Sequence, residues 1–170
     1  ISTSACAGWF DIGSSSGVVA VDGTNELNYE TATSCDVVIN AESADGSDTD
    51  SSTISIAITD HDEFDASTPT DSDSDANTLA ENVANGASAE ITASSSDADG
   101  STNTITYSIT AQSCAGAFAV GSSSGAVTVA DTSAIDYETA TSCTVTIKAA
   151  SSDGSDASAQ FTVTITDIDE

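Results

Sequence analysis

Apolar and polar residues alternate with a period of two along several segments in the second half of the chain. In residues 87–94 the odd positions, from Ala87 to Ala93, are apolar and the residues between them are polar. Successive side chains of a β-strand point to opposite faces, so this alternation predicts a strand with one buried face. The same pattern covers residues 104–109, 143–149 and 161–166, and shorter apolar groups occupy residues 79–83, 118–120 and 127–129.

These segments predict about seven strands. They are separated by turns rich in glycine, serine and aspartate, and no helical periodicity of useful length occurs. Many short strands joined by such turns are typical of a β-sandwich. We therefore expect an all-β fold.

The strand pattern belongs to an internal repeat with a period of 108 residues. The segment at Tyr29 to Cys35 and the segment at Tyr137 to Cys143 both read YETATSC. Residues 1–21, ISTSACAGWFDIGSSSGVVAV, align with residues 109–129, ITAQSCAGAFAVGSSSGAVTV. Such self-similarity predicts one small domain per period.

The repeat predicts two domains of unequal completeness. Residues 64–170 form a complete copy, whereas residues 1–63 hold only the C-terminal part of one, starting where the second copy reaches Ile109. Either the chain is an excerpt of a longer array, or a neighbouring subunit supplies the early strands. We favour the excerpt, because a half-domain with open sheet edges would be prone to aggregate.

The charge of the chain restricts its partners. Its formal net charge is −27, with 28 acidic residues and one basic residue, Lys148. Nucleic acid and anionic membranes attract positive charge, so both are excluded as partners. The carboxylates then bind a hard cation, keep the surface hydrated in high salt, or do both. No apolar run reaches the roughly 18 residues of a membrane span, and no signal peptide is visible, so we expect that one was removed or lies outside this piece.

The strands are set among motifs that resemble a cadherin-type repeat, in the form found in large bacterial surface proteins. The resemblance rests on AENVANGASAEITASSSDADGSTNTITYSI, on AGAFAVGSSSGAVTVADTSAIDYETATSCTVTIKAASSDG and on the closing FTVTITDIDE. It covers the whole second copy and the first copy from its third strand onward. It implies tandem Greek-key β-sandwich repeats, cadherin-like or immunoglobulin-like, with Ca²⁺ bound where neighbouring repeats meet.

The resemblance also implies the calcium ligands. In this sequence, the lower face of the first copy would supply Asn28, Glu30, Asp60 and Asp62. The upper face of the second copy would supply Asp97, Asp99, Asn103 and Asp153, which completes one junction. A further half-junction at the far end of the second copy would use Glu81, Asp136, Glu138, Asp167 and Asp169, and Asp45 would face the preceding repeat. Asn28 stands where the family usually has aspartate.

Residue chemistry agrees with this assignment. Calcium takes six to eight oxygen ligands and accepts carboxylates, Asn side chains and backbone carbonyls, whereas Mg²⁺ demands a tighter octahedron that flexible loops meet poorly. The run from Asp71 to Asn77, DSDSDAN, resembles the start of a calcium loop, but we favour a solvated loop because the EF-hand glutamate spacing is absent.

Four cysteines allow three pairings. Each copy carries its own pair, so the repeat favours Cys6–Cys35 and Cys114–Cys143 over the other two arrangements. Each bond would close a loop of about 29 residues, worth roughly 3 kcal/mol in the loop-entropy model. Disulfides indicate an oxidising, extracellular location. Four free buried thiols are the alternative.

Catalytic chemistry has no support in the sequence. His61 is the only histidine, and no serine has the context of an activated nucleophile. Trp9 replaces Ala117 of the other copy and is either a contact for sugar or protein or a residue that caps the core.

We therefore expect a non-enzymatic, structural or adhesive protein at the cell surface or in a filament. Its repeats would be stiffened by calcium and would bind neighbouring repeats, or identical chains, end to end. One alternative is a carbohydrate-binding module with the same fold, whose partners would be cell-surface carbohydrate or protein. Another is a halophilic surface-layer piece whose acids serve hydration alone.

Overall fold

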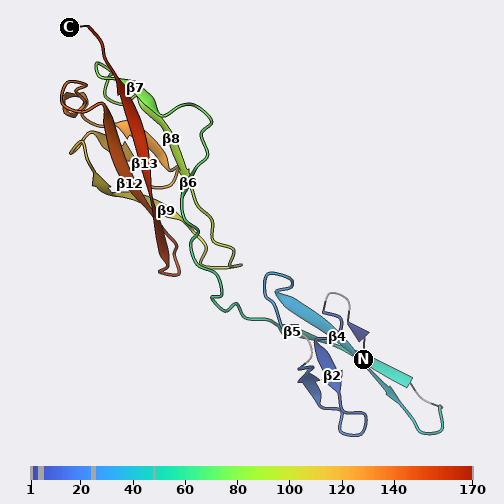
Figure 1. Ribbon diagram of the computed structural model, residues 1–170. Helices are drawn as coiled ribbons and strands as arrows, with labels where there is room; N and C mark the ends of the chain where they lie inside the picture. Colours follow the sequence, from blue (N-terminus) through green and yellow to red (C-terminus); the bar gives the residue numbers. More distant parts are fainter. Residues whose placement is uncertain (1, 4–5, 24–25, 48, 170) are drawn as a thin grey trace. The chain divides into compact units, whose positions relative to one another are not determined.

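The chain folds into two compact units, residues 1–62 and residues 63–170. The structure, a computed structural model, describes all residues except 1, 4–5, 24–25, 48 and 170. Apart from one short 3-10 helix, η1 (Thr132–Ala134), the regular elements of the described residues are β-strands (Figure 1). The predicted all-β fold is confirmed. No helix in the described part is both long enough and apolar enough to cross a membrane.

The second unit is a sandwich of two sheets. One sheet has the strand order β10-β11-β8-β6 and the other the order β7-β13-β12-β9, with antiparallel neighbours except for the parallel pair β7 and β13. The strands are β6 (Thr70–Asp71), β7 (Thr78–Ala80), β8 (Ser88–Ser94), β9 (Thr106–Gln112), β10 (Phe118–Val120), β11 (Ala126–Val129), β12 (Ser142–Ala150) and β13 (Asp156–Thr166).

Alternation along these strands builds the core between the sheets. On β12 the side chains from Cys143 to Ala149 at every second position are fully buried, and on β8 the same is true of Ala89, Ile91 and Ala93. All of them except Ala149 belong to one apolar cluster that both sheets share. Burial at every second residue is what the period of two predicts.

The first unit has fewer strands. A three-stranded sheet has the order β1-β4-β5, and a separate hairpin pairs β2 with β3. Its small core includes Phe10, Val37 and Trp9, and Trp9 is only 9% exposed, so the core-capping interpretation of this residue holds. The strands are β1 (Ser2–Thr3), β2 (Phe10–Ile12), β3 (Val19–Val21), β4 (Ser34–Glu42) and β5 (Thr49–Ala57).

One predicted strand needs new bounds, and one short strand was missed. The strand expected at residues 79–83 is β7, which begins at Thr78 and ends at Ala80. The short strand β6 was not predicted, because its two polar residues follow Pro69 and show no alternation. It exists because its backbone pairs with β8, where Thr70 lies opposite Ser94.

Both units carry one disulfide. Cys6 is bonded to Cys35 and Cys114 to Cys143, with Cα–Cα distances of 5.8 and 5.5 Å. This is the within-copy pairing that the repeat favoured. In the second unit the bond links the loop after β9 to the start of β12, so it ties together two neighbouring strands of one sheet.

Candidate metal centres

Three acidic side chains meet at one end of the second unit, which we call the far-end group: Glu81, Glu138 and Asp167. Carboxylate oxygens of these residues lie within 4.8 Å of one another. Strand pairing explains two of them. β7 runs parallel to β13 with Ala80 opposite Thr166, so the next residue of each strand, Glu81 or Asp167, leaves the sheet at the same end. Glu138 reaches the group from the turn between η1 and β12.

Glu81 is the fixed member of the far-end group. Its side chain is 8% exposed, and its two carboxylate oxygens accept hydrogen bonds from the backbone N–H groups of Tyr137 and Ile168, each at 2.8 Å. The first of these bonds holds the turn that contains Glu138, and the second holds the segment after β13. The carboxylate therefore fixes the two loops that carry the other acids.

The far-end group concentrates negative charge. A hydrogen bond from the residue's own backbone favours the charged form of Glu138, but desolvation and repulsion by Glu81 and Asp167 outweigh it and raise the pKa of Glu138 above its ordinary value. Asp136 adds to the repulsion. Burial and like charges both disfavour an ionised carboxyl, and a bound cation would relieve both.

The other two acids predicted for this end do not belong to the group. Asp136 accepts hydrogen bonds from the backbone and hydroxyl of Thr139, at 3.1 and 2.9 Å. The side-chain hydroxyl, followed by the backbone N–H, lowers the pKa of Asp136. Asp169 is exposed beyond the end of β13.

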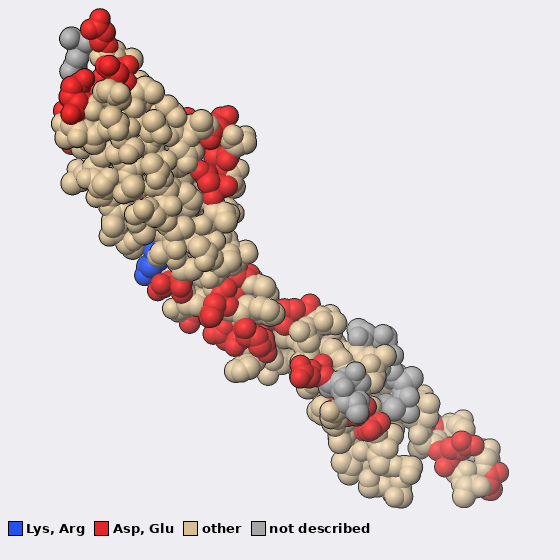
Figure 2. Space-filling view, in the orientation of Figure 1, with Lys and Arg blue, Asp and Glu red and all other residues tan. Residues whose placement is uncertain are grey.

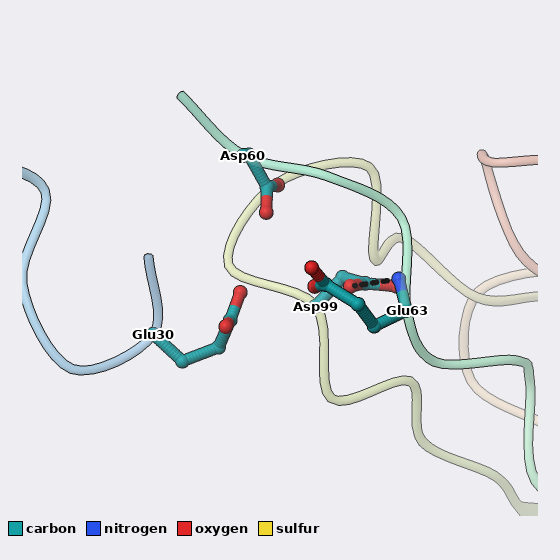
Figure 3. A group of neighbouring side chains, drawn as sticks. All are labelled: Glu30, Asp60, Glu63 and Asp99. Carbon is teal, nitrogen blue, oxygen red and sulfur yellow. Dashed lines mark hydrogen bonds between the residues drawn. The ribbon is translucent and has the colours of Figure 1, made fainter. Parts of the chain in front are cut away.

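A second acidic group lies at the opposite end of the second unit. It contains Asp99 and Asp153, whose carboxylate oxygens lie within 4.8 Å of each other. Asp153 occupies the turn just before β13, whereas Asp167 follows the last residue of that strand, so the two groups lie at opposite ends of the sheet. Asp99 is 1% exposed and accepts hydrogen bonds from the backbone N–H groups of Glu63 (3.1 Å) and Phe64 (3.2 Å). Figure 3 shows the first of these bonds.

Hydrogen bonds fix the loop that carries Asp99. The side-chain amide of Asn103 donates to the carbonyl of Asp99 at 2.6 Å, and Asp97 accepts from the hydroxyl of Ser151 and from the backbone N–H of Asp99. Ser151, as the stronger donor, and then Asp99 lower the pKa of Asp97. Asp97, Asp99 and Asn103 therefore lie in one hydrogen-bonded loop, and the carboxylate of Asp153, the fourth residue predicted for this end, lies close to that of Asp99.

In the first unit, the structure brings together Glu30 and Asp60. Their carboxylate oxygens lie within 4.8 Å of each other, and both side chains are drawn in Figure 3. Asn28 caps the turn that leads to Glu30, since its side-chain oxygen accepts from the backbone N–H of Thr31 at 2.7 Å. Asp62 is exposed at the end of the unit.

Asp45 lies at the tip of the turn between β4 and β5, and none of the acidic groups found among the described residues includes it. One of its oxygens accepts from the hydroxyl and backbone of Ser47, at 2.6 and 3.0 Å, and from the hydroxyl of Ser43. Chiefly Ser47, and then Ser43, lower the pKa of Asp45 to about 2.

The change Ser47→Ala is therefore expected to raise the pKa of Asp45 toward the ordinary value of about 3.9, because the strongest donor to its carboxylate is lost. An NMR titration of the Asp45 carboxyl carbon measures it. Ser51→Ala, in the adjacent strand, is the control and should leave that pKa unchanged. An unaltered Asp45 titration in the Ser47 variant would show that the hydroxyl does not set it.

Two acidic residues were missed by the sequence analysis. Glu63 has a carboxylate oxygen within 4.8 Å of one from Asp99, and Glu90 forms a third group with Asp73 and Asp75. Glu63 lies in the same acidic run as the predicted Asp60 and Asp62, so proximity in sequence could have indicated it. Glu90 looked like an ordinary solvent-facing strand residue, and no signal in the sequence connects it with residues 73–75.

The chemistry of these groups suits a hard cation. Their side chains offer oxygen ligands only, and Lys148, the sole Lys or Arg residue, is paired with Asp156 at 3.5 Å. Figure 2 shows acidic side chains gathered at the ends of the second unit and in one patch on its side, with a broad flank free of them in this view. Converging carboxylates fit Ca²⁺ better than a transition metal, which favours nitrogen or sulfur ligands.

The fold and these groups define a class: a β-sandwich repeat with oxygen-rich loops at the ends of its strands. A family model described as the cadherin domain matches residues 75–166, which is just over half of the chain. The chain belongs to the cadherin family. The resemblance to a cadherin repeat is thus confirmed, whereas its form in large bacterial surface proteins stays a prediction. Cadherin domains are, as a class, extracellular adhesion modules.

Solved cadherin structures share the fold. A structure titled protocadherin gammaB7 EC3-6 cis-dimer has a TM-score of 0.74 and 24% identity, covering 98% of this chain and 40% of that one. Mouse cadherin-23 EC22-24 has a TM-score of 0.69 and 22% identity, covering 95% of this chain and 51% of that one. Drosophila N-cadherin EC1-4 has a TM-score of 0.69 and 21% identity, covering 95% and 38%.

The chain thus spans between about two fifths and one half of the length of these structures. At these identities, the likeness establishes the fold alone. No curated protein sequence matches the chain.

Proposed function

We propose that the chain is part of an extracellular, adhesive array of cadherin repeats in which Ca²⁺ bound at the ends of each repeat holds successive repeats in a fixed arrangement. The proposal includes the predicted setting, a cell-surface adhesin or filament whose partners are neighbouring repeats or identical chains joined end to end. Membership of the cadherin family and two disulfides support an extracellular location.

The observation that carries the proposal is the presence of carboxylate groups at both ends of one sandwich. Asp99 and Asp153 lie where β13 begins, and the far-end group lies where it ends. A repeat with cation ligands at both ends can share ions with a neighbour at either side. In this arrangement Glu81 and Asp99, the buried acids of the described residues, would each hold an ion at its own end of the sandwich, and the exposed acids at that end would complete the oxygen shell.

The physical effect of the ion would be to convert repulsion into coordination. Without a cation, the carboxylates of the far-end group repel one another and oppose the hydrogen bonds that hold their loops. Bound Ca²⁺ supplies two positive charges that bring these loops together. Hydrogen bonds within the chain hold the ligands in place before the ion binds, because Glu81 accepts from the backbone N–H groups of Tyr137 and Ile168 and so fixes both loops.

Calcium is expected to raise the free energy of unfolding by about 2.7 kcal/mol at a concentration 100 times the dissociation constant. Thermal unfolding would be measured with Ca²⁺, with excess chelator and with Mg²⁺, at matched ionic strength. Glu81→Gln should remove much of the calcium-dependent increment. Glu42→Gln, an exposed acid of β4 outside the acidic groups of the described residues, should retain it.

Comparing increments, rather than absolute stabilities, separates ion binding from damage to the fold. In the Glu81→Gln variant the side-chain amide cannot accept two backbone hydrogen bonds as the carboxylate does, so this variant loses some stability even without calcium. Equal stability in Ca²⁺ and in excess chelator at matched ionic strength would contradict the proposal and favour the hydration of a halophilic surface instead.

A further inference from the structure

Asn85 is the one asparagine of the chain that is followed by glycine. It lies with Gly86 in the turn between β7 and β8. Glycine has no Cβ, so its backbone nitrogen is unhindered and can attack the side-chain carbonyl of a preceding asparagine. Both residues are exposed, and nothing lies within 4 Å of a Cβ placed on Gly86, so water reaches the pair. Sequence and exposure together favour this pair for the loss of a side-chain amide.

The fold holds both of the groups that would react. The N–H of Gly86 donates to the carbonyl of Val129 at 2.7 Å, and the side-chain oxygen of Asn85 accepts from the N–H of Thr132, also at 2.7 Å. Val129 ends β11 and Thr132 begins η1, so both anchors belong to one short segment. The first bond engages the nitrogen that would attack, and the second fixes the amide that would be attacked.

The turn is closed in a form that keeps these two bonds in place. The N–H of Ala87 donates to the carbonyl of Ala84 at 3.1 Å, and Gly86 has a φ of 86°, the left-handed value that the third residue of a type II turn requires. The N–H of Val129 donates in return to the carbonyl of Ala87 at 2.9 Å. Attack by the nitrogen of Gly86 therefore requires the turn to leave β11.

We propose that Asn85 is a modification site, which deamidates when this turn leaves β11 and η1 and is protected while the turn is docked. The only reactant besides the chain is water. The inference goes beyond the proposed function and does not rest on bound calcium.

The reaction balances in atoms and electrons. In the open turn the N–H of Gly86 loses its proton to hydroxide, and the nitrogen attacks Cγ of Asn85. A bond between that nitrogen and Cγ forms, the bond between Cγ and Nδ2 breaks, and Nδ2 takes a proton from water and leaves as ammonia. Water then opens the succinimide ring at either of its carbonyls, which leaves an isoaspartyl or an aspartyl residue. The net change exchanges water for ammonia, without oxidation or reduction.

The product would make the opening permanent. An isoaspartyl residue adds a methylene group to the backbone ahead of Gly86, so the N–H of Gly86 no longer meets Val129 in the same register. Either product also places a carboxylate where the amide bonded Thr132, next to Asp131, which caps η1. The hydroxyl of Thr132 donates to the carbonyl of Glu81 at 3.3 Å, so the change reaches a residue of the far-end group.

The test compares the docked turn with the unfolded chain. The full chain, in excess chelator, is incubated at one mildly alkaline pH in native buffer and in guanidinium chloride. Peptide mapping by mass spectrometry follows the loss of the amide at Asn85, and an isoaspartyl-specific methyltransferase measures the isoaspartyl product. Deamidation should be slower by about tenfold or more in native buffer, since only the open fraction of the turn reacts. Asn85→Gln should abolish the signal, and Asn82→Gln, nearby in the sequence, should leave it unchanged.

Two substitutions of Thr132 isolate the bond that holds the side chain of Asn85. Thr132→Pro removes the N–H that donates to Asn85, and proline is tolerated there because the residue is the first of η1 and follows an extended N-cap. Thr132→Val keeps the N–H and removes only the hydroxyl. The proline variant should deamidate about two- to tenfold faster in native buffer, the range that one hydrogen bond contributes. The valine variant should match the unaltered chain, and in guanidinium chloride all three should react at the same rate.

Hydrogen exchange separates opening of the turn from unfolding of the whole unit. In the proline variant the amides of Gly86 and Ala87 should exchange faster, while those of Ser142–Ala150 in β12 should keep their rates. Equal deamidation in native buffer and in denaturant, or equal native rates for the proline and valine variants, would overturn the proposal.

Discussion

Replacing Ile147 with alanine is expected to lower the free energy of unfolding of the second unit by about 4 kcal/mol. Ile147 is fully buried in β12, where its neighbours across the sheet are Ala159 and Ile109. Truncation removes methyl and methylene groups from contact with the core and leaves a cavity that the two packed sheets cannot fully close. Such changes cost about 2–5 kcal/mol. Native-state hydrogen exchange at the amides of β12 and β13 measures the loss in this unit alone.

The internal repeat provides a matched control for this change. Ile39 has the same residue type at the equivalent position of the first copy, but it is half-buried. Ile39→Ala is expected to cost the first unit about 1 kcal/mol, because the side chain already contacts water and its loss leaves no closed cavity. Equal losses for the two substitutions would contradict the difference in burial between the two positions.

How far the sequence predicts this fold depends on the range of the interactions concerned. The long strands β8, β12 and β13 follow from alternation, because a side-chain period of two is a local property of the chain. Strand β6 could not be found in the same way. Thr70 and Asp71 are polar, and they form a strand only because β8, which is distant in the sequence, offers a backbone partner.

The acidic groups show the same limit. Motif positions identified Glu81, Glu138 and Asp167, and the parallel pairing of β7 with β13 brings two of them to one end of the sheet. Motifs could not tell which of several adjacent acids converge, because that depends on the turn. In the segment after η1, Asp136 bonds to Thr139 instead, whereas Glu138 joins the group.

The group that Glu90 forms with Asp73 and Asp75 could not be predicted from the sequence for a related reason. Glu90 lies in β8 with a φ of 52°, an uncommon value for a residue with a side chain. The loop that carries Asp73 is held beside β8 by Asp71, whose side chain accepts from the backbone N–H groups of Asp73 and Thr92. This non-local arrangement leaves no periodic signal in the sequence.

The disulfide pairing could be predicted because it follows from the repeat and not from the turns. Each copy holds two cysteines, so pairing within a copy gives each unit its own bond. The structure has that arrangement at the same sequence separation of 29 in each unit. The thin core explains why such a link matters: the sequence has only 5% aromatic residues, so packing alone supplies less stability than in a typical domain.

Replacing both Cys114 and Cys143 with serine is accordingly expected to lower the free energy of unfolding of the second unit by about 3 kcal/mol, chiefly because the unfolded chain regains the freedom of an uncrosslinked loop. Cys143 is fully buried, so a serine there adds the cost of burying a polar hydroxyl in the core. The variant Cys114→Ala with Cys143→Ala avoids this cost and reports the loss of the crosslink without it. Denaturant unfolding of both variants under oxidising conditions, compared with the unaltered chain under reducing conditions, measures the effect. The alanine variant and the reduced chain should lose similar amounts and the serine variant somewhat more. A double-alanine variant as stable as the oxidised chain would show that strand pairing between β9 and β12 holds the sheet without the bond.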